Sequence, residues 1–232
     1  MVISRENGRL PSVFQRLAEQ LIMTVTSDTL KNQLDLAGQL LAEDEPHQAF
    51  DICRTILSVD PHSWEALNLA GVAAFKAGLP DDAIELLHNS IFLEPNNAIA
   101  YCNLGNIFSE LKQFCKAREC YKKAIDCNPN YAEAYFNLGL LEYNSGNILE
   151  AIKTLQDTLK KKQNHALALH TLGNIYKDLG QLTASKISFQ KAIKSDSKLA
   201  EARTNLASVL HELGDFKNAL KRCEQAIRIN PL

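Results

Sequence analysis

The chain has 232 residues, of which 46% are hydrophobic, 22% charged and 7% aromatic. This composition is ordinary for a soluble globular protein and excludes a disordered tail or a membrane protein. The formal net charge of -2, from 25 basic and 27 acidic residues, gives no basic excess toward nucleic acid or anionic lipid. We therefore expect neither nucleic acid nor a membrane as a partner.

The first predicted element is a helix near residues 13–26, within an N-terminal segment of residues 1–29. Ser12 and Gln15 have the spacing of a capping box, and apolar residues follow at helical spacing. We expect this helix to cover the first repeat described below. The opening residues lack the apolar run of a secretory signal, and the six cysteines include no C-x-x-C pair. The sequence therefore predicts a cytoplasmic protein with reduced cysteines.

Glycine and proline then recur at a fixed interval of 34 residues along the chain (105 − 71 = 34). One glycine series keeps this interval throughout, at Gly71, Gly105, Gly139 and Gly173. A second series lies seven places later and lacks a member at 112, with Gly78, Gly146, Gly180 and Gly214. Proline keeps the same period, with Gln163 and Ser197 at the two skipped places. Such a fixed period indicates an array of repeated units.

With position 1 at Leu30, the repeats span 30–63, 64–97, 98–131, 132–165, 166–199 and 200–232. Positions 4, 7, 8 and 11 form one apolar helical stripe, and positions 20, 24, 27 and 28 form a second. Small residues at positions 8 and 20 allow the two helices to approach closely. Glycine at position 15 fits the positive φ that ends the first helix, and proline at position 32 stops the second. The pattern predicts an all-α solenoid of antiparallel helix pairs.

The residues at these repeat positions resemble the tetratricopeptide repeat, and the resemblance covers the whole chain from Leu30 onward. It implies a right-handed superhelix whose first helices line a concave groove. Proteins of this family usually end on a polar capping helix, and none follows Pro231. We therefore expect an open apolar edge near Ile227 and Ile229. The edge belongs either to a fragment of a longer protein or to a surface for self-association.

Catalytic and metal-binding motifs are absent where the sequence can be checked for them. There is neither a phosphate-binding glycine loop nor a nucleophile elbow. His165 and His170 are five places apart and so lie on different faces of a helix, which does not suit a zinc pair. Cys115, Cys120 and Cys127 also lack the spacing of a zinc knuckle. We expect no enzymatic activity, no metal and no cofactor.

The candidate binding residues lie on the first helices, beside the packing stripe, and most of them are asparagines. An amide both donates and accepts, so a row of amides can hold the main chain of an extended peptide. The alternative is that these amides hydrogen-bond within the scaffold. The row is similar to the asparagine ladder of O-linked N-acetylglucosamine transferases, with departures at Asp35, Leu69 and Thr171. The predicted groove residues are Asn103, Asn106, Phe136, Asn137, Tyr143, His170, Asn174 and Asn205.

The sequence therefore predicts a protein–protein interaction scaffold that binds an extended peptide or a partner protein in its groove. The alternative function is the substrate-recruiting arm of a larger enzyme, a glycosyltransferase or a methyltransferase, whose catalytic domain lies outside this chain. Positions 5 and 6 of the repeats contain no Lys or Arg. For this reason we do not expect the carboxylate clamp of chaperone adaptors.

Overall fold

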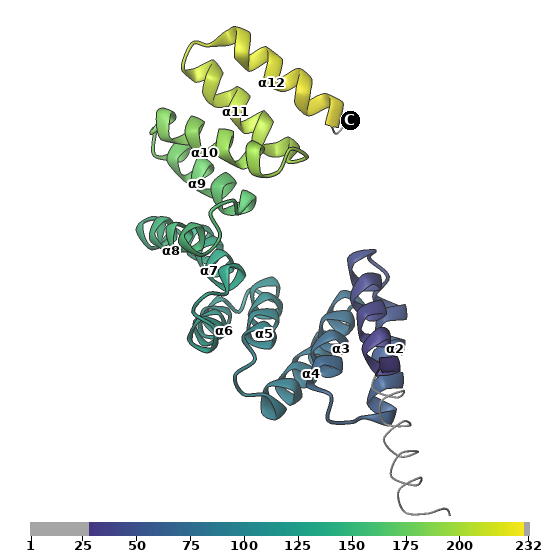
Figure 1. Ribbon diagram of the computed structural model, residues 1–232. Helices are drawn as coiled ribbons and strands as arrows, with labels where there is room; N and C mark the ends of the chain where they lie inside the picture. Colours follow the sequence, from purple (N-terminus) through teal and green to yellow (C-terminus); the bar gives the residue numbers. More distant parts are fainter. Residues whose placement is uncertain (1–27, 230–232) are drawn as a thin grey trace, which may run out of the picture. The chain divides into compact units, whose positions relative to one another are not determined.

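The computed structural model describes residues 28–229, and all regular structure within this range is α-helical (Figure 1). The helix predicted near residues 13–26 lies outside the described residues. Residues 28–42 form the first described helix. The helices that follow are α2 (Pro46–Val59), α3 (Trp64–Lys76), α4 (Pro80–Leu93), α5 (Ala98–Glu110), α6 (Phe114–Cys127), α7 (Ala132–Asn144), α8 (Ile148–Lys161), α9 (Ala166–Asp178), α10 (Leu182–Ser195), α11 (Ala200–Glu212) and α12 (Phe216–Ile229).

From α3 onward a helix of 13 residues alternates with one of 14 residues. A short turn joins each shorter helix to the next helix, so the two run antiparallel and pack as a hairpin. The chain divides into two compact units, residues 1–95 and 96–232. Within the second unit, the longer helix of each hairpin also packs on the first helix of the following hairpin. Each unit has its own clusters of buried side chains.

Glycine at position 8 sets the distance between the helices of a hairpin. A Cβ atom at Gly105 would lie 2.6 Å from Tyr121 Cε1, and one at Gly173 would lie 2.5 Å from Phe189 Cε1. Both rings are buried. The close approach predicted from the small residues is therefore confirmed at these positions.

The turn after the first helix of each hairpin places one residue in the left-handed region. The second glycine series occupies it, with φ of 83° at Gly78, 81° at Gly146, 70° at Gly180 and 79° at Gly214. At the place where that series lacks a glycine, Lys112 has φ of 59°, and Asp44 has φ of 62°. The turn thus imposes this conformation whether or not glycine is present, at a steric cost for the two side chains.

Glu142 is a carboxylate in the predicted apolar stripe, at position 11 of its repeat. Its side chain is 10% exposed and accepts a bidentate pair of hydrogen bonds from Arg118, at 2.7 Å from Nε and 3.2 Å from Nη2. Asn147 Nδ2 donates to the same carboxylate at 2.6 Å. The Arg118 guanidinium lowers the pKa of Glu142. A bidentate ion pair therefore replaces an apolar contact between α6 and α7.

Apolar side chains are exposed on the first and last described helices. Leu36 is 46% exposed, although Leu104, Leu172 and Leu206 at the same repeat position are buried. Ile227 on α12 is 60% exposed. No further described helix packs on these faces.

Candidate functional site

Asn106 on α5 and Asn137 on α7 form a pair of hydrogen-bonded amides between consecutive repeats. Asn137 Nδ2 donates to Asn106 Oδ1 at 2.9 Å and to Cys102 Sγ at 3.4 Å. The hydroxyl of Tyr121, a buried residue of α6, donates to the same Asn106 oxygen at 2.9 Å. Asn106 Oδ1 therefore uses both of its lone pairs within the scaffold.

The same arrangement recurs two repeats later. Asn205 Nδ2 on α11 lies 2.9 Å from Asn174 Oδ1 and 3.0 Å from His170 Nε2, both on α9. An amide nitrogen can only donate, so His170 Nε2 accepts and the ring proton is on Nδ1. Burial lowers the pKa of His170, which favours this neutral form. We call Asn106 with Asn137 the first amide pair, and Asn174 with Asn205 the second.

The intervening repeat step has no amide pair. Thr171 replaces asparagine at position 6 and donates its hydroxyl to the carbonyl of Leu167 at 2.9 Å. The facing positions on α7 hold Phe136 and Leu140. The Phe136 ring contacts the His165 ring, with centroids 4.7 Å apart. An apolar and aromatic step thus separates the two amide pairs.

Each amide pair retains one donor and one acceptor. Asn106 Nδ2 and Asn174 Nδ2 donate to no described residue, and Asn137 Oδ1 and Asn205 Oδ1 accept from none. Asn106 is exposed, and the other three side chains are half-buried. The chain therefore offers two N–H and oxygen combinations to a ligand, which match the C=O and N–H of a peptide main chain.

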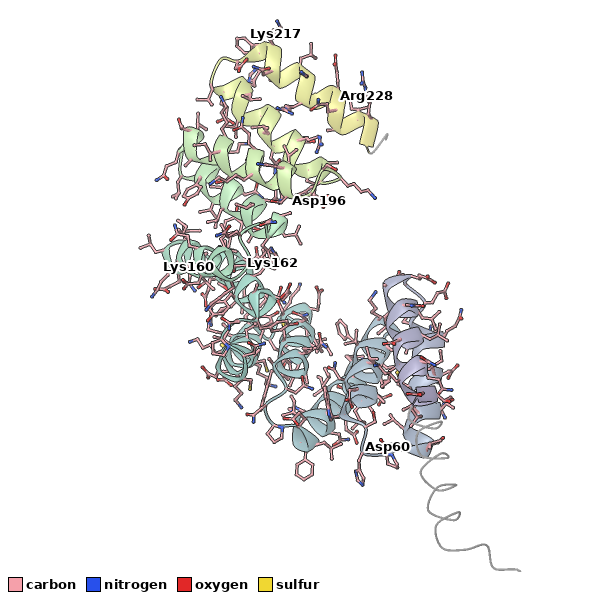
Figure 2. The ribbon with its side chains drawn as sticks, viewed as in Figure 1. Asp60, Lys160, Lys162, Asp196, Lys217 and Arg228 are labelled. Atoms are coloured by element: carbon pink, nitrogen blue, oxygen red, sulfur yellow. The ribbon has the colours of Figure 1, made fainter. Side chains whose placement is uncertain are left out.

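Both amide pairs lie in hollows of the surface. The first hollow has a volume of about 550 Å³ and also includes Asn103 and Phe136. At its edge Lys162, labelled in Figure 2, forms an ion pair with Glu133 at 3.2 Å. The second hollow, of about 640 Å³, includes the second amide pair, His170, Thr204 and Ile227. Seven of the eight predicted groove residues line one of these two hollows.

Tyr143 does not line either hollow. Its hydroxyl donates to Asp178 Oδ2 at 2.6 Å, which connects α7 to α9. Burial, together with the Asp178 carboxylate, raises the pKa of Tyr143 to about 12. The structure therefore gives this predicted groove residue a contact within the scaffold.

Among the residues of the first hollow that sequence reasoning missed are Glu133, Lys162 and His165, and it also missed Tyr121, which supports Asn106. His165 Nδ1 accepts from the backbone N–H of Ala168 at 3.2 Å and so caps α9. The available signal for Tyr121 was a hydroxyl at position 24, which otherwise holds apolar or cysteine side chains. Whether the Tyr121 hydroxyl can contact Asn106 depends on the length of the tyrosine side chain. The spacing of repeat positions in the sequence carries no information about that length.

Residues 28–229 contain no group of three His, Cys, Asp or Glu side chains placed to hold a metal ion. None of the helices described is both long and apolar enough to cross a bilayer. The chemistry at hand is that of amides, aromatic rings and a few charges.

Stacked helical hairpins that recur at a fixed interval define a helical-repeat solenoid. Tetratricopeptide repeat profiles match residues 40–98, 133–162, 166–199 and 200–231, and a TPR repeat profile matches residues 105–146. The chain therefore carries tetratricopeptide repeats, as its period predicted. A comparison with curated protein sequences gives no match.

Solved structures with the same fold include pilF of Pseudomonas aeruginosa, which is 17% identical. That match has a TM-score of 0.76 and covers 88% of this chain and 93% of pilF. A MamA protein is 27% identical, with a TM-score of 0.56 and coverage of 75% and 96%. YrrB, described as a TPR protein with an unusual peptide-binding site, is 17% identical, with a TM-score of 0.57 and coverage of 77% and 92%. The predicted all-α solenoid of antiparallel helix pairs is confirmed.

Proposed function

We propose that this protein is an interaction scaffold that binds an extended peptide segment along α5, α7, α9 and α11. The observation that carries the proposal is the unused hydrogen-bonding capacity of the two amide pairs. The likeness to YrrB, whose description names a peptide-binding site, supports the same class of ligand.

The proposed contacts are with the peptide main chain. Asn106 Nδ2 donates to a peptide carbonyl and Asn137 Oδ1 accepts a peptide N–H, with Asn174 and Asn205 doing the same further along. Each neutral hydrogen bond contributes about 0.5–1.5 kcal/mol, so four of them give a modest affinity that tolerates many side chains. Phe136, between the pairs, adds a preference for an apolar or aromatic peptide side chain.

The pairs are held ready for a ligand by the scaffold itself. Gly105 makes room for Tyr121, Tyr121 donates to Asn106, and Asn106 in turn accepts from Asn137. Because these bonds exist before binding, less side-chain entropy is lost when a peptide arrives. Thr171 interrupts the row of asparagines between the two pairs, so the proposed peptide has two separate anchoring points.

The proposal is tested by replacing the two acceptors. The variant Asn137→Ala with Asn205→Ala is compared with the wild type on an array of short immobilised peptides, and bound peptides are then titrated in solution. We expect affinity to fall about tenfold or more, because each truncation removes a hydrogen bond and opens its pair. Circular dichroism should show an unchanged helix content.

The matched control is Asn89→Ala with Asn144→Ala, which removes two exposed amides from α4 and α7. This control should bind every peptide as the wild type does. Equal peptide binding by both double variants would contradict the groove proposal. Unfolding of the Asn137 and Asn205 variant would assign these amides to the scaffold alone.

A further inference from the structure

A third hollow, of about 600 Å³, lies beside the end of α10 and has a different chemistry from the groove. Leu159 and Leu169 give it two apolar lining residues, Gln163 and Asn164 contribute amides, and Lys191 and Lys194 contribute two ammonium groups. No acidic residue is among those that line it.

The two lysines carry charge that the described scaffold leaves uncompensated. Lys191 and Lys194 are three places apart on α10, so they lie on the same face, and both are exposed. Neither forms an ion pair with any residue of the range 28–229. The sequence of α10 itself, Leu182–Ser195, contains no Asp or Glu. An acidic ligand therefore meets no competing carboxylate on this helix.

The preceding repeat provides an internal comparison, because its lysines at this place have partners within the scaffold. Lys160 forms an ion pair with Asp157 at 2.7 Å. Lys161 Nζ lies 5.8 Å from the centre of the Tyr135 ring, whose hydroxyl donates to the carbonyl of Pro129 at 3.3 Å. One repeat later, Lys191, Leu169 and Gln163 stand at the positions of Asp157, Tyr135 and Pro129. Loss of the ring, the carboxylate and the proline leaves a hollow with free cations.

The charge of the surrounding unit has the same sign. Residues 96–232 contain 19 Lys and Arg against 13 Asp and Glu, a formal charge of +6, although the whole chain carries -2. This potential attracts an acidic partner toward the hollow from solution.

We propose that this hollow is a second peptide-binding site, which takes a segment of alternating acidic and aliphatic residues. The ammonium groups of Lys191 and Lys194 hold carboxylates, and the partly buried Leu159, together with the edge of the buried Leu169, receives an aliphatic side chain. A free anion such as phosphate leaves these two leucines unused, so a peptide satisfies more of the lining. The site shares Asn164 with the first hollow, but it does not depend on the amide pairs or on the function proposed for them.

The test uses a fluorescein-labelled decapeptide of alternating Glu and Leu, with the Gln and Leu peptide as its neutral counterpart. Fluorescence anisotropy measures binding to the full chain at physiological salt. We expect the acidic peptide to bind at least about tenfold more tightly than the neutral one. Lys191→Gln with Lys194→Gln should weaken it about tenfold. The matched pair Lys153→Gln with Lys221→Gln removes the same charge from exposed positions on α8 and α12 and should retain wild-type binding.

Three results would overturn the proposal. Equal weakening by both lysine pairs would show diffuse attraction in place of a site. Displacement of the peptide by millimolar inorganic phosphate would show a simple anion site. Loss of binding in the variant Asn137→Ala with Asn205→Ala would place the acidic peptide in the groove. Retained binding in that variant, with loss in the Lys191 and Lys194 variant, supports the proposal whatever becomes of the groove.

Discussion

At the scale of single residues, the distance between paired helices depends on the absence of a methyl group at position 8 in four of the six repeats, at Gly71, Gly105, Gly139 and Gly173. The ring of Phe189 is fully buried and lies where a side chain at Gly173 would begin. A ring enclosed on all sides cannot rotate away into solvent, so the two helices would have to separate. Packing here is therefore decided by shape more than by hydrophobicity.

We expect Gly173→Ala to lower the free energy of unfolding by about 1–3 kcal/mol, because the added methyl overpacks the contact with Phe189. Gly38→Ala is the control, since it lies in the helix of residues 28–42 with no atom within 4 Å of the added carbon. That change should raise stability by about 0.5–1 kcal/mol through helix propensity. Urea unfolding followed by circular dichroism measures both. Equal effects of the two changes would contradict the packing argument.

At the scale of elements, the first helices of the hairpins differ in how their leading N–H groups are satisfied. Side chains of Ser63 and Asn97 accept hydrogen bonds at the starts of α3 and α5, as expected for good N-caps. At the start of α9 the acceptor is His165 Nδ1, which loses this capacity when it is protonated. Burial, and then the nearby charge of Lys162, lowers the pKa of His165. The cap of α9 is thus the titratable one of the three.

A lowered pKa in the folded state means that the unfolded chain takes up this proton first as the pH falls. The contribution of neutral His165 to the free energy of unfolding is therefore complete above its ordinary pKa of 6.5. This contribution is lost as the pH falls below that value. Thermal unfolding between pH 7 and pH 5 should therefore show a smaller loss of stability for His165→Asn, whose amide caps without titrating. Ser63→Asn, which exchanges one non-titrating cap for another at the start of α3, should keep the wild-type slope. A His165→Asn slope equal to that of the wild type would refute the assignment.

The order, spacing and turn geometry of these elements were predictable from the sequence, but the contacts between them were only partly so. Glycine at positions 8 and 15 follows from steric requirements that act on one residue at a time. The amide pairs require knowledge of side-chain rotamers, because Asn137 could turn toward Asn106 or away from it. The third hollow was not predicted. It exists because Leu169 is smaller than Tyr135, the residue at the same position of the preceding repeat, and leaves space beside α10. A sequence pattern lists the residues that are present, but a cavity between their side chains can be found only from the three-dimensional packing.

At the scale of the whole molecule, stability is distributed over neighbouring hairpins. Each of the two units contains its own buried clusters, for example around Ala73 in residues 1–95 and around Phe189 in residues 96–232. In a repeat array each hairpin contacts mainly its neighbours, so a local defect is felt locally. A single free energy of unfolding then does not describe the chain fully.

Hydrogen exchange measured by mass spectrometry on Gly173→Ala tests this distribution. Amide exchange should accelerate in α9 and α10 and, to a smaller degree, in the helices packed on them. The amides of α2, α3 and α4 should exchange at wild-type rates, because they belong to the other compact unit. Uniform acceleration along the chain would show one cooperative unit instead.

The amide pairs have a consequence for how such a chain changes by duplication or exchange of repeats. Each pair takes one asparagine from each of two successive repeats, so no repeat contains a complete recognition element. Excision of residues 166–199 would bring Asn205 to face Leu140 and remove one pair without altering any remaining residue. Chimaeras joined at repeat boundaries would therefore gain or lose recognition at each new junction. The order of the repeats, as well as the residues within each repeat, therefore determines which amide pairs this surface can form.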